Sequence, residues 1–189
     1  MKHQLLLASL ALAATSMTSQ VLAGAVTVLG PGPAQTCYLA ADQGLPAGDY
    51  LQYCNMALAG TLTDRDRAAT FVNRGVLKLT MNEANGAQDD FNAGLAINDQ
   101  MGEAYVDRGV TLIIQKRFAD AITDIDKGIA LGSKEAHVAY FDRAMANESL
   151  GNVQAAYGDY RQALVIEPNF TRASDELKRF KVVPKPSGS

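Results

Sequence analysis

Apolar and small residues recur at intervals of three and four along most of the chain, and this pattern itself repeats. The segments FVNRG, YVDRG and YFDRA begin at Phe71, Tyr105 and Tyr140, which are 34 and 35 residues apart. A second series follows each of them: AQDDFNAGLAI from Ala87, AITDIDKGIAL from Ala121 and AAYGDYRQALVI from Ala155. Intervals of three and four are the period of an amphipathic helix. Each unit is therefore predicted to contain two amphipathic helices, A and B, joined by a turn.

The small and aromatic residues of these units resemble the tetratricopeptide repeat, in a protein of the exported bacterial type. Helix A carries an aromatic residue and, four positions later, a small one: Phe71 and Gly75, Tyr105 and Gly109, Tyr140 and Ala144. Helix B carries the alanine, aromatic and alanine positions as Ala87, Phe91 and Gly94, then Ala121, Ile125 and Gly128, then Ala156, Tyr160 and Ala163. Pro168 closes the third unit as in the family, whereas Asp99 and Ser133 stand there in the first two. The resemblance covers roughly residues 68–170 and implies an all-α fold, a right-handed αα-superhelix of about three hairpins.

Both ends of such an array need covering, because each hairpin leaves an apolar face that a neighbour must bury. After the third unit, Phe170, Ala173, Leu177 and Phe180 recur at three, four and three, which predicts a C-terminal capping helix. Residues 67–181 are thus assigned to the three units and the cap, and residues 182–189 to a disordered tail. Residues 34–66 fit the repeat register as a degenerate N-terminal hairpin.

The two cysteines lie in this degenerate hairpin. In the register of the resemblance, Cys54 takes the aromatic position of helix B and Cys37 the position that arginine holds in helix A of the other units. The two would then face each other, and a structural disulfide is expected, which suits a chain sent to an oxidising compartment. The alternative is a metal or redox pair, but no third ligand lies close by and the spacing is not C-x-x-C.

Residues 1–23 have the order of a secretory signal peptide. Lys2 and His3 precede the apolar run LLLASLALAA, and small residues follow up to a cleavage position after Ala23. The run is short for a stable bilayer span, so an uncleaved anchor is the less favoured alternative. Residues 24–33 are then a linker, and the mature chain is expected to be exported, periplasmic or secreted, without membrane insertion.

Composition and charge indicate a globular chain, and a nucleic-acid partner is not expected. Apolar residues make up 48% of the sequence and charged residues 20%. Loss of Lys2 with the signal peptide leaves 16 basic against 20 acidic residues, a net charge of −4, and no basic cluster is present. The oligomeric state is left open.

The arginine of helix A recurs in all three units. Each arginine has an aspartate sixteen residues later in helix B, which predicts three structural ion pairs: Arg74 with Asp90, Arg108 with Asp124, and Arg143 with Asp159. If the pairs are buried, loss of one partner should cost about 3–5 kcal/mol. If they are exposed, it should cost about 1 kcal/mol or less.

Motifs for catalysis, cofactors or metals are not found in the sequence. The mature chain has one histidine, His137, which excludes most imidazole-based sites. The sequence contains no Walker-type loop, G-x-S-x-G or H-E-x-x-H. TDIDKG at residues 123–128 has two carboxylates but breaks the order of an EF-hand loop. No catalytic residue, cofactor or metal is therefore assigned, although the acidic residues leave carboxylate catalysis open.

The resemblance implies that a protein or peptide partner binds the concave face formed by the A helices. In register, that face carries Val72, Asn73, Val76, Val106, Asp107, Val110, Phe141, Asp142 and Met145. No basic set suited to a C-terminal carboxylate is present, so the strip suits an extended apolar or basic segment. The expected function is a non-enzymatic binding or assembly module of the cell envelope. The alternatives are an envelope enzyme or hydrolase accessory factor, an inert helical spacer, and a groove filled by the chain's own termini.

Overall fold

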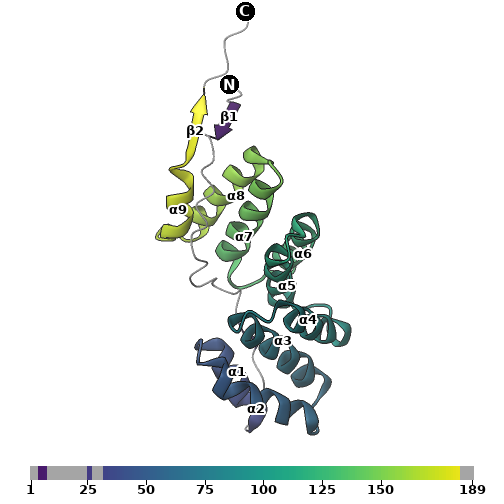
Figure 1. Ribbon diagram of the computed structural model, residues 1–189. Helices are drawn as coiled ribbons and strands as arrows, with labels where there is room; N and C mark the ends of the chain where they lie inside the picture. The colour runs from purple at the N-terminus through teal and green to yellow at the C-terminus, as the bar shows by residue number, and fades with distance from the viewer. Residues whose placement is uncertain (1–3, 8–24, 27–31, 184–189) are drawn as a thin grey trace, which may run out of the picture.

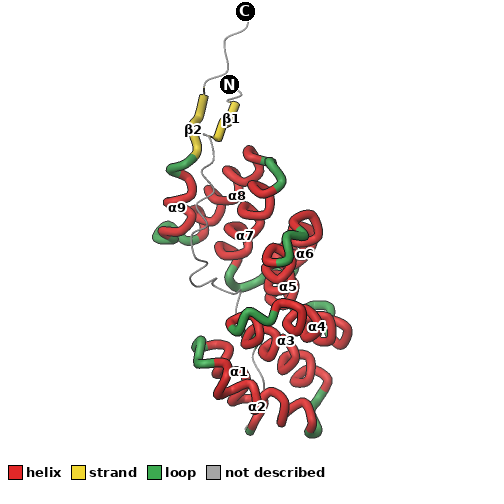
Figure 2. The backbone as a smooth tube through the Cα atoms, in the orientation of Figure 1, coloured by secondary structure: helices red, strands yellow, loops and turns green. Residues whose placement is uncertain are grey.

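The computed structural model describes residues 4–7, 25–26 and 32–183, and in this part of the chain almost all regular structure is helical. The helices stack in chain order from α1 to α9 (Figure 1) and are joined by short loops (Figure 2). Their bounds are α1 Pro33–Asp42, α2 Ala47–Ala59, α3 Asp64–Thr80, α4 Ala84–Ile97, α5 Gly102–Ile114, α6 Phe118–Ala130, α7 Ala136–Ser149, α8 Val153–Ile166 and α9 Thr171–Leu177. The predicted all-α superhelix of repeated hairpins is confirmed.

The three predicted units are the hairpins α3–α4, α5–α6 and α7–α8. Within each unit the two helices pack along their length; α4 and α6 also pack on helix A of the next unit, and α8 packs on α9. The core positions of helix B are Phe91, Ile125 and Tyr160, which are 0, 0 and 1% exposed. Each unit therefore completes its core with its neighbours, as expected of a stacked array.

Small residues let the helices of a unit and of neighbouring units approach closely. A Cβ added at Gly109 would lie 2.6 Å from Cγ1 of Ile125 in helix B of the same unit. A Cβ added at Gly128 would lie 2.5 Å from Cγ2 of Val106 and 2.8 Å from the carbonyl oxygen of Gly102. None of these three distances is compatible with a side chain, so these two crossings require glycine.

The turn between helix A and helix B places one residue in the left-handed region in each unit. These residues are Asn82, Lys116 and Gly151, with φ of 61°, 62° and 78°. Their spacing repeats the period of the array, so the turn geometry is conserved from unit to unit although the residue type is not. Glycine is the least strained choice at this position, and only the third unit has it.

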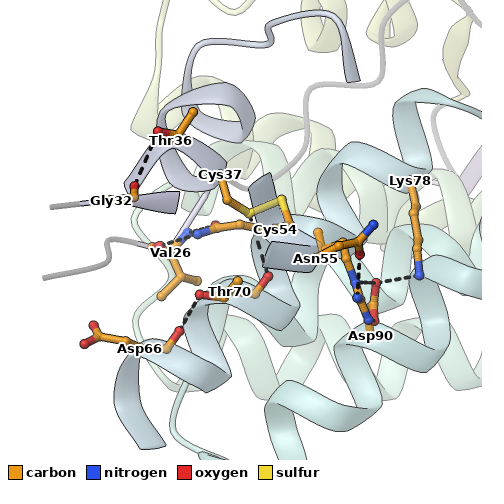
Figure 3. The surroundings of a disulfide bond; sticks show 12 residues. Val26, Gly32, Thr36, Cys37, Cys54, Asn55, Asp66, Thr70, Lys78 and Asp90 are labelled. Carbon is orange, nitrogen blue, oxygen red and sulfur yellow. Dashed lines mark hydrogen bonds and ion pairs between the residues drawn. A yellow bond between two sulfur atoms is a disulfide. The ribbon is translucent and has the colours of Figure 1, made fainter. Parts of the chain in front are cut away.

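The degenerate hairpin α1–α2 packs against α3 and contains the disulfide Cys37–Cys54. Both cysteines are fully buried in a cluster with Ala40, Ala47 and Leu77, so the bond lies between the hairpin and the first regular unit. Figure 3 shows the bond above α3, where the Cys37 sulfur lies 4.0 Å from the carbonyl oxygen of Thr70.

The C-terminal end differs in part from the prediction. Helix α9 ends at Leu177, and Phe180 begins a strand, β2 (Phe180–Val183), instead of the last turn of the capping helix. This strand pairs antiparallel with β1 (Gln4–Leu7), with Leu7 opposite Phe180. Phe180 is nevertheless buried, against Tyr157 and Tyr160 of α8. Phe180 therefore covers the end of the array as predicted, but it does so from a strand and not from a helix.

Two assignments made at the chain ends fall mostly outside the described residues. Of the predicted signal peptide, only residues 4–7 are described, as β1. Of the predicted tail, residues 182 and 183 belong to β2, and residues 184–189 lie outside the described part.

Candidate binding face

The candidate binding residues lie on α3, α5 and α7, and we call this surface the helix A face. Contrary to the expectation of an open strip, eight of the nine residues are buried and only Met145 is half-buried. The exposed fractions are 0% for Val72, Asn73, Val106 and Asp107, 2% for Val110, 3% for Val76 and Phe141, and 4% for Asp142. The face is covered in part by other segments of the same chain, which is the alternative that the sequence left open.

On the first unit, the covering segment includes Val26. The main-chain N–H of Val26 donates to Oδ1 of Asn73 over 2.7 Å, and Nδ2 of Asn73 donates to the carbonyl oxygen of Val26 over 2.8 Å. The Val26 side chain packs against the core cluster of this unit. A single amide side chain thus binds both main-chain groups of a residue that is 47 positions away.

On the third unit, the start of the C-terminal cap covers Phe141. The rings of Phe141 and Phe170 meet edge to face at 5.4 Å between centroids, and the Arg172 guanidinium carbon lies 4.3 Å from the Phe141 ring centroid. Asp142, the next candidate residue along α7, is also buried.

Asp142 has an unusual environment for a carboxylate. Its Oδ2 atom is buried and has no hydrogen-bond partner, and the same is true of Nη1 of Arg172. Burial raises the pKa of Asp142 from 3.8 to about 7, and the positive charge of Arg172 opposes this shift. Burial also raises the pKa values of two neighbouring groups, Tyr160 and Glu176. The arrangement leaves a buried acceptor and a buried donor without partners on the same face.

The arginine and aspartate of each unit form the pair that their spacing predicts. In all three units Nε and Nη2 of the arginine donate to the two carboxylate oxygens, over distances of 2.6–3.0 Å. Each guanidinium also lies over the helix A aromatic ring of its own unit, 5.0–5.5 Å from the centroid. The hydrogen bond to Asp124 raises the pKa of Arg108, so this guanidinium stays charged at any ordinary pH.

The third nitrogen of each arginine makes a contact that the sequence reasoning missed. Nη1 donates to a side chain of the preceding helix B, namely Asn55 for Arg74, Asn92 for Arg108 and Asp126 for Arg143. Each arginine therefore bridges two B helices, its own and the previous one. The sequence contained a signal for this, because each acceptor directly follows the core position of helix B, just as each paired aspartate directly precedes it.

Other sites for chemistry are not found among the described residues. In this part of the chain no group of three or more His, Cys, Asp or Glu side chains is placed to hold a metal ion. Both cysteines are used in the disulfide. Within the same residues, no helix has the length and apolar character needed to cross a membrane.

Comparison with known proteins gives similarity at the level of structure. No protein-family model matches the sequence, and no curated protein is similar to it in sequence. The first tetratricopeptide repeat domain of Spaghetti (RPAP3), bound to an HSP90 peptide, has 25% identity, a TM-score of 0.56, and coverage of 59% of this chain and 90% of its own. The second such domain of human RPAP3, in complex with an HSP70 peptide, has 20% identity, a TM-score of 0.58, and coverage of 62% and 97%. MamA has 19% identity, a TM-score of 0.62, and coverage of 75% and 80%.

These likenesses agree with the repeat spacing, the helical hairpins and the glycine crossings described above. The chain therefore has the tetratricopeptide repeat fold, in which three regular units stand between a disulfide-linked N-terminal hairpin and a C-terminal cap.

Proposed function

We propose that the protein is a non-enzymatic binding or assembly module that holds an extended protein segment on its helix A face. The contact between Asn73 and Val26 carries this proposal. Recognition through main-chain hydrogen bonds accepts many sequences, and flanking side-chain pockets then add specificity. The face already holds one segment in this manner, and that segment is part of the same chain.

Two further observations support a peptide or protein as the partner. The RPAP3 domains that resemble this chain hold HSP90 and HSP70 peptides, so the fold is suited to such partners. The helix A face of this chain carries Asp107 and Asp142 but no basic residue among the nine candidates. A partner bound here would use its main chain and apolar side chains, and a terminal carboxylate would be disfavoured.

The setting that we propose is the cell envelope, after export. The N-terminal pattern of a signal peptide supports it, and so does the buried disulfide, because disulfides persist in oxidising compartments and are rare in the cytosol.

Site-specific photo-crosslinking tests the proposal without disrupting the core. A photoreactive amino acid replaces Met145, the half-buried candidate residue, in the full chain expressed in its source cells. The matched control places the same group at Gln154, which is exposed on helix B of the same unit. We expect a discrete protein adduct from position 145 and none from position 154. The absence of an adduct at 145, or the same adduct from both positions, would contradict the proposed binding face.

A further inference from the structure

Two buried polar atoms without hydrogen-bond partners belong to the third unit of the helix A face and the cap that covers it. Asp142 is 4% exposed, and its Oδ2 atom accepts no hydrogen bond. Nη1 of Arg172, from the start of α9, is buried and donates none. The two groups are near enough for the charge of Arg172 to act on the Asp142 carboxyl. Native proteins rarely leave such atoms unsatisfied, because each one costs free energy without a partner.

The first unit shows what a residue at this position of helix A does. Asn73 and Asp142 occupy the same position, as does Asp107 between them, one residue before the arginine of each unit. Asn73 supplies one acceptor and one donor, and these bind the N–H and C=O of Val26. An aspartate oxygen can replace the acceptor, but once the carboxyl group is ionised, above about pH 7 for Asp142, it has no donor. Arg172 supplies the missing donor from the neighbouring helix.

We propose that Asp142 and Arg172 form a second main-chain clamp on the third unit, which binds the N–H and C=O groups of an extended peptide when that peptide displaces the segments of the chain that bury the site. The clamp continues the line of the Asn73 contact along the same face. This inference rests on the proposed function and adds to it the place on the array where the main chain of a partner is bound.

The charges at the site favour a neutral main chain over a cationic side chain. An ammonium group near Asp142 would also meet the guanidinium of Arg172, and like charges at close range in a buried site repel strongly. A peptide group carries no net charge and matches one acceptor and one donor. The rings of Phe141 and Phe170 pack edge to face beside the site, and the half-buried Phe170 offers apolar surface to the side chains of the bound segment.

The test uses a library of random nine-residue peptides, selected on the wild-type chain. Nine extended residues reach about 30 Å, enough to cover the site and its surroundings. The dissociation constant of an enriched peptide is then measured for wild type, Asp142→Leu, Asp142→Asn, Arg172→Met and the control Gln154→Ala. A series of copies of this peptide, each N-methylated at one backbone position, identifies the N–H group that the protein uses.

We expect Asp142→Leu and Arg172→Met each to weaken binding about 10- to 100-fold, the range for hydrogen bonds to charged groups. Asp142→Asn should bind within about threefold of wild type, because an amide oxygen also accepts from an N–H. One N-methylated peptide should bind wild type weakly and show no further loss with Asp142→Leu. The melting temperature of Asp142→Asn should not fall, because the amide keeps an acceptor of the same shape and removes a buried carboxylate oxygen that has no hydrogen-bond partner.

Several results would overturn the clamp. Equal affinities for all variants would show that neither residue contacts the peptide. Enriched peptides that share a lysine or arginine and tolerate N-methylation throughout would show that Asp142 binds a side-chain cation instead. A library that yields binders sensitive to Asn73→Ala but not to either clamp variant would sustain the proposed function and reject the clamp. If no peptide is enriched on wild type, the proposed function itself is contradicted, and the clamp with it.

Discussion

The ion pair of the second unit allows a quantitative test of what holds the array together. Arg108 donates to the carboxylate of Asp124 over 2.7 and 2.8 Å and to Oδ1 of Asn92, in the preceding helix B, over 2.9 Å. The substitution Arg108→Leu removes all three hydrogen bonds at once. It also leaves the charge of Asp124 without its partner, in a position where that side chain is 13% exposed.

The expected magnitude follows from this partial burial. Removing one member of a fully buried pair costs about 3–5 kcal/mol, and removing one member of an exposed pair costs at most about 1 kcal/mol. The Arg108 side chain is 22% exposed, so the pair lies between these limits but closer to the buried one. We expect each single substitution, Arg108→Leu or Asp124→Leu, to lower the free energy of unfolding by about 2–3 kcal/mol. The double substitution should lose clearly less than the sum.

Urea denaturation of the four proteins at neutral pH gives the coupling energy directly. We expect a coupling of about 1.5–2 kcal/mol that changes little between low and high salt, because a largely buried pair is weakly screened. Strictly additive losses, or a coupling that disappears at high salt, would refute this reasoning. Arg74→Leu provides an internal comparison, since Lys78 also contacts Asp90 over 2.8 Å and would still neutralise it. Its cost should be smaller.

Four other variants test separate parts of the structure. Replacing Cys37 and Cys54 by alanine should lower the free energy of unfolding by about 3 kcal/mol, because the bond closes a loop of 17 residues; an unchanged urea midpoint would count against this. Gly128→Ala should cost about 1–3 kcal/mol, since its Cβ would lie 2.8 Å from a backbone oxygen of α5. Gly158→Ala, where nothing lies within 4 Å, should instead stabilise by about 0.5–1 kcal/mol, and equal thermal shifts for the two would contradict the packing argument. Asp142 keeps its proton to about pH 7 in the folded chain but loses it near pH 3.8 when unfolded, so wild type should lose stability as pH rises between these values. Asp142→Asn should lack that part of the slope in melts recorded across this range, and identical slopes would show that Asp142 does not cause it.

The repeat could be predicted from the sequence because the same pattern of residues occurs in all three units. The spacing of Phe71, Tyr105 and Tyr140 gives the period, and the sixteen-residue interval from Arg108 to Asp124 gives a contact that the hairpin must bring together. Errors in register would have been inconsistent between units, so three copies check one another. The disulfide followed from the same register, applied to a unit that no longer resembles the others.

The binding face was harder to predict, because its burial depends on segments that do not repeat. The sequence around Val26 does not indicate that its main chain binds Asn73, because any residue type except proline offers the same main-chain N–H and C=O groups. Arg172 was not singled out from the sequence, although its guanidinium lies over the Phe141 ring and near Asp142. Helical periodicity identifies which side of a helix is apolar, but it does not identify what covers that side.

The contact between Asn73 and Val26 also determines how affinities for the first unit should be understood. A segment tethered to its own binding site acts as a competitor at an effective concentration of about millimolar. A free peptide that binds this unit must displace it. The measured dissociation constant is then the intrinsic one divided by the fraction of molecules in which the tethered segment has left the site. Weak partners would then be excluded from the first unit at ordinary concentrations. A partner that first binds elsewhere on the array would itself become tethered, and could exchange with the segment on equal terms.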